Sequence, residues 1–111
     1  MAWVIGAMDA TVIRTNMMRV AVMALRLDLP GTRSLKEKRG VVKGVLERVR
    51  NRFQVAVAEV DHQDHWQTAG LGFAAVGNDV AVLQSRLQKV AQFIETEAAG
   101  VVVDFRVEFL A

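Results

Sequence analysis

The sequence predicts an α+β domain of the ferredoxin-like type, with the element order βαββαβ. Four segments rich in β-branched and apolar residues alternate in that order with two segments of helical periodicity. Each helical segment carries one apolar stripe, which a four-stranded antiparallel sheet with both helices on one face would cover. Right-handed crossovers then set the strand order 4-1-3-2. The length of 111 residues, with 52% hydrophobic and 23% charged residues, fits one packed domain.

The first strand is expected over residues 19–29, RVAVMALRLDL. Alternation places Leu25 and Leu27 on one face, and Ala24 and Arg26 on the other. A Pro-Gly pair follows and ends the strand, because proline has no N–H for the ladder and glycine favours a turn.

A helix is expected to begin after Ser34, whose spacing to Glu37 is that of a capping box. In this motif the serine hydroxyl accepts a hydrogen bond from the Glu37 amide, while the Glu37 carboxylate reaches back to the serine amide. Apolar residues recur at helical spacing after the cap and form one stripe: Leu35, Val42, Val45, Leu46, Val49 and Phe53.

Residues 53–61 and 68–76 are expected to form an antiparallel hairpin, with 62–67 as its connection. Asn78 and Asp79 are candidate N-caps of a second helix. The apolar stripe of this helix is expected to comprise Val80, Leu83, Leu87, Val90, Ala91 and Ile94. The last strand is expected over 101–110 and alternates, with one face formed by Val103, Phe105, Val107 and Phe109 and the other by Asp104, Arg106 and Glu108.

The composition excludes several classes of site and partner. The chain has no cysteine, which rules out disulfides, thiolate metal sites and cysteine nucleophiles. No apolar run approaches the roughly 18 residues that a bilayer-spanning helix needs, so we expect no membrane partner and a cytoplasmic setting.

The net charge of only +2 conceals a basic cluster on the first helix and its approach. The cluster comprises Arg33, Lys36, Lys38, Arg39, Lys43, Arg48, Arg50 and Arg52, against only two carboxylates, Glu37 and Glu47. At 100° per residue, four of these cations fall within an arc of about 60° beside the apolar stripe. The nucleic-acid-binding candidates are therefore Lys36, Arg39, Lys43 and Arg50, a row suited to contacting successive phosphates. The alternative is a solvated helix face without a ligand.

The connection at 61–66, DHQDHW, is the densest collection of polar side chains in the chain. His62, Asp64 and His65 have donor atoms for a metal ion, and either histidine has the chemistry of a general base. Three closely spaced loop residues match no established ligand motif, however, and a hairpin connection needs polar, turn-forming residues in any case. We therefore expect no metal, no cofactor and no catalytic residue. Trp66 is expected to be a packing anchor, with stacking on a nucleic-acid base as the alternative.

Glu59 breaks the pattern of the second strand, because strict alternation gives it the same face as Val55 and Val57. It is expected either to be buried with a partner, such as an arginine of the first helix, or to be moved outward by a bulge. Nothing beside it in sequence completes an acid–base pair, which favours a structural role. Glu59, His62, Asp64 and Trp66 together make up the possible functional loop.

The sheet face opposite the helices is expected to carry small side chains, among them Ala24, Ala56, Ala58, Gly70, Gly72 and Ala74. An RNA-recognition domain of this topology needs exposed aromatic residues on its central strands, so that mode of RNA binding is not expected. A flat face of small and apolar residues suits another sheet, another subunit or the chain's own N-terminal segment. The glycines are equally explained by a bulge or a close approach of another backbone.

Several short motifs are spread over residues 18–110: Pro30-Gly31, SLKEKR at 34–39, NRF at 51–53, AEVDHQD at 58–64 and Trp66-Gln67. Through these residues the chain resembles the YlxP-like family of small bacterial proteins of unknown function. The resemblance implies a ferredoxin-like fold and no particular activity. In many bacteria the family's genes lie near those for translation initiation factor two and ribosome-binding factor A, which implies work on RNA or the ribosome. Two departures are His65, where an apolar residue is more usual, and residues 1–17, which precede the usual start. The resemblance therefore implies an N-terminal extension at 1–17 ahead of a single domain at 18–111. This extension reflects either a misassigned start codon or a segment that packs on the sheet.

The leading functional hypothesis is an accessory protein that binds structured RNA or the ribosome through its basic first helix. The second is a homo-oligomeric interaction module that uses the small-residue sheet face. The third, a metal-binding or hydrolytic enzyme centred on His62 and Asp64, ranks behind a non-enzymatic role.

Overall fold

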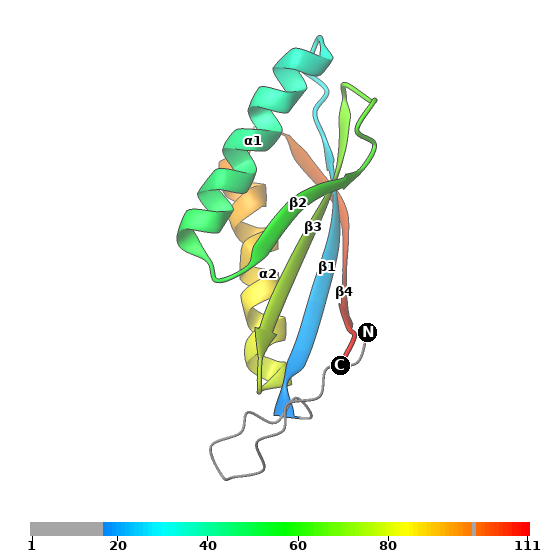
Figure 1. Cartoon of the computed structure of the whole chain (residues 1–111). Coiled ribbons are helices and arrows are strands. Elements are labelled where there is room, and N and C mark those ends of the chain that lie inside the picture. Colours follow the sequence, from blue (N-terminus) through cyan, green and yellow to red (C-terminus); the bar gives the residue numbers. More distant parts are fainter. Residues whose placement is uncertain (1–16, 99) are drawn as a thin grey trace, which may run out of the picture.

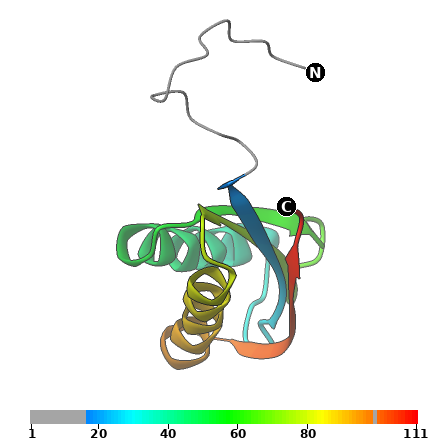
Figure 2. The same cartoon turned by 90° about the horizontal axis from the view of Figure 1, so that it is seen from below.

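The structure is a computed structural model that describes residues 17–98 and 100–111. Its elements run in the order β1 (Arg19–Asp28), α1 (Leu35–Arg52), β2 (Ala56–Asp61), β3 (Thr68–Gly77), α2 (Val80–Glu97) and β4 (Val101–Phe109). All strand pairs are antiparallel and the sheet order is β2-β3-β1-β4, which confirms the predicted α+β topology. Both helices lie on the same side of the twisted sheet (Figures 1 and 2). The expected extension at 1–17 lies outside the described residues except for Met17.

The core lies between the helices and one face of the sheet. Strand β1 supplies Met23, Leu25 and Leu27 to this face, and β3 supplies Leu71 and Phe73. The opposite side of β1 carries the alternating, more exposed residues, as the sequence predicted. We call the sheet face away from the helices the open face.

Helix α1 begins as predicted, because Ser34 Oγ accepts a hydrogen bond from the Glu37 amide at 3.1 Å. Val42, Val45 and Val49 of its stripe are buried. The helix ends at Arg52 with Phe53 as its C-cap, and the Phe53 N–H donates to the Val49 carbonyl at 2.9 Å. The prediction that β2 begins at residue 53 is therefore wrong, because this backbone hydrogen bond belongs to the helix.

Helix α2 begins at Asp79, whose carboxylate accepts from the amides of Ala81 at 2.9 Å and Val82 at 3.3 Å. Its buried stripe is the predicted one except at the first position. Val80 is 42% exposed, because the stripe reaches the sheet only from Leu83 onward. Among the described residues, no helix is long and apolar enough to cross a membrane.

Two bulges interrupt the strand alternation. In β2, Glu59 pairs with Leu71 and Asp61 with Gly70, so Val60 is the extra residue. In β4, Asp104 pairs with Arg26 and Val102 with Leu27, so Val103 is the extra residue. The prediction that Val103 shares one face with Phe105, Val107 and Phe109 is therefore wrong for Val103. Val102 packs against the core in its place, and Val103 is 50% exposed.

Candidate nucleic-acid interface

The four predicted phosphate-contacting cations lie along one exposed flank of α1. Lys36, Arg39, Lys43 and Arg50 are all exposed. From the first to the last, the row extends about 21 Å at 1.5 Å per residue. Arg52 lies about 160° around the helix from Arg50, and its guanidinium sits 5.0 Å from the centroid of the Phe93 ring of α2. The row therefore occupies the flank of α1 that is turned away from α2.

None of these four cations takes part in an ion pair within the part of the chain that the structure describes. The ion pairs found there are Arg26–Asp28 and Lys38–Glu59, and His62 lies near Asp61. The flank thus keeps its positive charge available to an outside anion.

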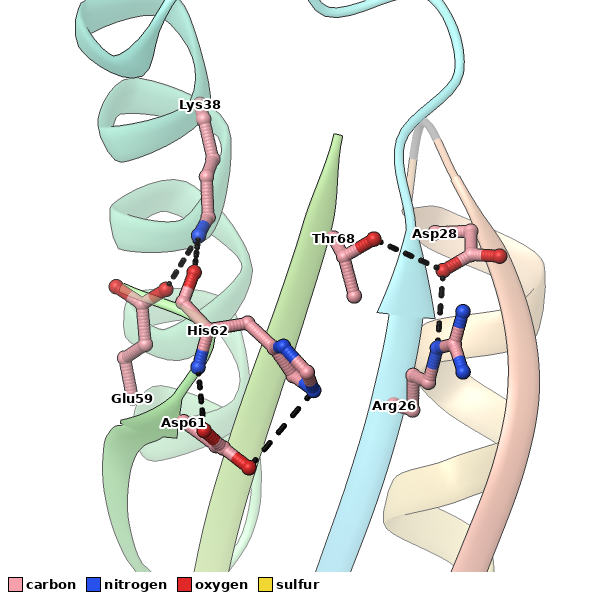
Figure 3. Close-up of polar contacts among 7 residues, drawn as sticks. All are labelled: Arg26, Asp28, Lys38, Glu59, Asp61, His62 and Thr68. Carbon is pink, nitrogen blue, oxygen red and sulfur yellow. Dashed lines mark hydrogen bonds and ion pairs between the residues drawn. The ribbon is translucent and has the colours of Figure 1, made fainter. Parts of the chain in front are cut away.

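Lys38 does not belong to this basic surface, although the sequence counts it in the same cluster. Its side chain is fully buried, and its ammonium lies 2.9 Å from Glu59 Oε2. The same nitrogen donates a short hydrogen bond to the His62 carbonyl (Figure 3). Glu59 Oε2 is buried without a well-directed hydrogen bond, so charge attraction is what satisfies it. The partner of Glu59 is accordingly a lysine, and the expected arginine is wrong.

The burial of Lys38 beside the candidate loop was not predicted from the sequence. Lys38 lies on the buried stripe with Val42, Val45 and Val49, at the helical spacing i, i+4, i+7 and i+11. Arginine has a rigid planar head, whereas lysine delivers one compact charge through a flexible stem that packs among apolar side chains. The sequence did contain a signal for this pair. Lys38 falls on the apolar stripe of the helix, and Glu59 falls on a core-facing position of the next strand. Two opposite charges at such positions indicate a buried ion pair.

The segment after β2 is shaped by His62. This residue has φ 58°, in the left-handed region that non-glycine residues seldom adopt. Its carbonyl accepts from Lys38 Nζ and from the His65 amide, and its own amide donates to Asp61 Oδ1 at 2.8 Å. These bonds hold the backbone in its unusual conformation. The imidazole Nε2 lies 3.7 Å from Asp61 Oδ2, and the His62 and His65 rings meet edge to face at 5.2 Å.

The structure does not bring the loop residues together as a metal site. In residues 17–98 and 100–111, no group of three or more histidine or acidic side chains is placed to hold a metal ion. Asp64 and His65 are exposed, whereas His62 is half-buried. Trp66 is 48% exposed, so the indole is only partly covered by the protein, and both the packing role and the stacking role stay predictions.

The loop with Trp66 is fastened to the approach of α1. The Leu29 amide donates to the Gln67 carbonyl at 2.8 Å, and Gln67 Nε2 donates to the carbonyls of Pro30 and Thr32. Together with the bond from Lys38 to His62, these contacts hold the β2–β3 connection beside the first turn of α1, and Figure 1 shows both at one end of the molecule. The exposed indole and the first cations of the basic row therefore share that end.

The glycines of β3 accommodate the bulge in β2. A Cβ atom added at Gly70 would lie 2.7 Å from Asp61 Cβ, and one at Gly72 would lie 2.8 Å from Val60 Cγ1. Side chains of β2 therefore occupy the space above both glycines on the open face. This confirms the alternative in which the glycines mark a bulge and a close approach.

The described residues form shallow hollows on the open face. A hollow of about 390 Å³ is bordered by charged side chains, including Arg26, Asp61 and Arg106. A second hollow, of about 360 Å³, is apolar and is lined by small residues such as Ala24, Ala58 and Ala74. Val60 borders both hollows.

Comparison with known proteins agrees with the resemblance that the motifs indicated. Residues 20–107 match the family described as "Protein of unknown function (DUF503)". Over 63 residues the chain is 44% identical to the "Uncharacterized protein YlxP" of Bacillus subtilis (strain 168), a match that covers 57% of this chain and 68% of the relative. The de novo designed protein Ferredog-Diesel superposes with a TM-score of 0.45 and 11% identity, over 97% of this chain and 99% of its own. Because the family match spans most of the chain, this protein belongs to the DUF503 family of proteins of unknown function.

Proposed function

We propose that this protein binds structured RNA, free or within the ribosome, through the exposed basic flank of α1. The observation that carries the proposal is the row of Lys36, Arg39, Lys43 and Arg50, which is exposed and has no carboxylate partner among the described residues. Cations in line neutralise successive phosphates and release condensed counterions, which is the main source of affinity for a nucleic-acid backbone.

A helix flank that presents only long cationic side chains recognises backbone and shape rather than sequence. The grooves of A-form RNA favour this kind of contact, because the deep major groove keeps base edges out of reach of side chains. A solvent-exposed helix face without a ligand is also compatible with four cations on one flank. Measuring the affinity for RNA distinguishes the two.

The exposed Trp66 extends the proposed interface at the N-terminal end of α1. Stacking on an aromatic ring recognises an unpaired base without reading its sequence. The preferred ligand is accordingly a helical RNA segment that adjoins an unpaired base, with the duplex on α1 and the base on the indole.

The test is filter binding to fragments of ribosomal RNA over a series of salt concentrations. With four phosphates of a duplex neutralised, the slope of log K against log salt is expected to be about −3.6. In the triple variant Lys36→Ala/Lys43→Ala/Arg50→Ala, the slope should fall to about −1 and binding should weaken at every salt concentration. Far-UV circular dichroism should match the wild type, because all three side chains are exposed.

A matched control removes three exposed cations that lie off the row, in the variant Arg19→Ala/Arg48→Ala/Lys89→Ala. The two variants change the net charge equally, so a general charge effect weakens both alike, whereas a defined interface weakens only the first. Equal losses in the two variants, or tight binding that ignores salt, would rule out the basic flank as the RNA-binding surface.

A further inference from the structure

Strand β4 is a long edge strand whose outer side is unoccupied in the described part of the chain. It pairs with β1 alone, at one border of the sheet β2-β3-β1-β4 (Figure 1). An exposed edge of nine residues presents unpaired N–H and C=O groups that readily accept another strand, and proteins usually shorten, bend or charge such edges. The opposite edge, β2, is shorter, with six residues and a bulge near its end.

The backbone pattern shows which groups of β4 point outward. The Leu110 amide donates to the Val20 carbonyl at 2.9 Å, so even-numbered residues bond toward β1 in this antiparallel ladder. The regular register from Ala21–Phe109 to Arg26–Asp104 preserves that alternation. The N–H and C=O groups of Phe105, Val107 and Phe109 therefore point away from β1, toward solvent.

Large apolar side chains accompany this edge. Phe105 and Phe109 pair with core positions of β1, yet remain 40% and 39% exposed on the helix side of the sheet. Helix α2 leaves these rings partly uncovered at the border. Another strand laid against β4 would cover them.

The charges on the other side of β4 identify the partner. Asp104, Arg106 and Glu108 stand in a row on the open face, so the strand carries an alternating pattern of negative, positive and negative charge. A pattern of this kind is complementary to its own antiparallel copy. From it we propose that β4 pairs antiparallel with β4 of a second copy of this chain, about a two-fold axis, and joins two sheets into one of eight strands.

The charges also select the register. With Val107 opposite Val107 of the second copy, Arg106 faces Glu108 of that copy twice, and Phe105 faces Phe109 of it twice. A shift of two residues would place Arg106 opposite Arg106 and Asp104 opposite Glu108, which like charges disfavour. A further shift would place Arg106 opposite Asp104, but its pairs would then include the bulged residue Val103.

The open face is the competing site for a second copy. The spaces above Gly70 and Gly72 are already filled by side chains of β2, which removes part of the reason for expecting a partner there. Its apolar hollow also lacks any charge pattern that would select its own copy, since only uncharged residues line it.

The proposal is tested by measuring the mass of the full chain in solution by sedimentation over a concentration series. The wild type is expected to approach twice 12.2 kDa. Arg106→Glu and Glu108→Arg should each shift the protein to monomer, because each places like charges opposite one another. The double variant Arg106→Glu/Glu108→Arg restores opposite charges in the proposed register and should recover the dimer.

A second variant separates loss of pairing from loss of folding. Val107→Pro removes an outward N–H that β1 does not use, which an edge strand tolerates. It should be a folded monomer by circular dichroism. A monomeric wild type, a dimer that withstands both single reversals, or a double variant that stays monomeric would overturn the proposed pairing. Dissociation by Ala24→Glu with no effect of the β4 variants would assign the dimer to the open face and equally overturn it.

Discussion

Replacing Lys38 with methionine is expected to lower the free energy of unfolding by about 3 kcal/mol. Removing one member of a buried ion pair leaves the other charge uncompensated, which typically costs about 3–5 kcal/mol. Methionine preserves the unbranched stem and removes only the ammonium. The Glu59 side chain retains 19% exposure, whereas Lys38 has none, so water relieves part of the loss at the glutamate and keeps the cost at the lower end. The His62 carbonyl still accepts from the His65 amide.

Urea unfolding followed by far-UV circular dichroism measures this change as a lower midpoint with an unchanged slope. The melting temperature should fall by about 10–20 °C for a domain of this size. Lys36→Met is the matched control, because it removes an exposed lysine two positions away on the same helix and should change stability by no more than about 0.5 kcal/mol.

Glu59→Gln changes the other member of this ion pair and leaves the fully buried Lys38 ammonium without its carboxylate. Combining it with Lys38→Met in a double-mutant cycle isolates the coupling between the two charges. If Lys38→Met proves no more costly than Lys36→Met, the pair does not stabilise the fold and this reasoning fails.

Further substitutions test the bulge, the helix and the proposed stacking surface. Gly70→Ala should lower stability by about 1–3 kcal/mol in the same urea experiment, since its methyl group would meet Asp61, and an unchanged midpoint would contradict the close approach. Gly40→Ala, in an exposed helical position with nothing within 4 Å, should raise stability by about 0.5–1 kcal/mol. Trp66→Ala should weaken binding to RNA with unpaired bases by about 1–3 kcal/mol, while Trp66→Phe retains most of the affinity. An equal effect of Trp66→Ala on fully paired RNA would speak against stacking.

The fold was predictable because its signals are local and repeated. Alternation in β1, the Ser34 cap and the apolar stripe of α1 each depend on residues within a few turns of one another. The exposed basic row was also predictable, because helical geometry alone places Lys36 and Arg50 on one flank. The start of β2 was not, because it depends on where α1 ends. The bulge at Val60 and the register of β4 were not either, because both depend on pairing with a distant strand.

The amino-acid sequence by itself determined the order of elements and the row of cations, since both follow from periodicity read along the chain. The predicted sheet topology followed from that order, because crossovers between strands are right-handed. Only the tertiary structure decided that Lys38 is buried against Glu59, that His62 is held in a left-handed conformation, and that Trp66 is exposed. These outcomes depend on which parts of distant elements meet. Lys36 and Lys38 are the same residue type two positions apart, so the residue type alone does not distinguish them. Lys38 has a different role because its side chain meets Glu59 of β2 and the His62 carbonyl.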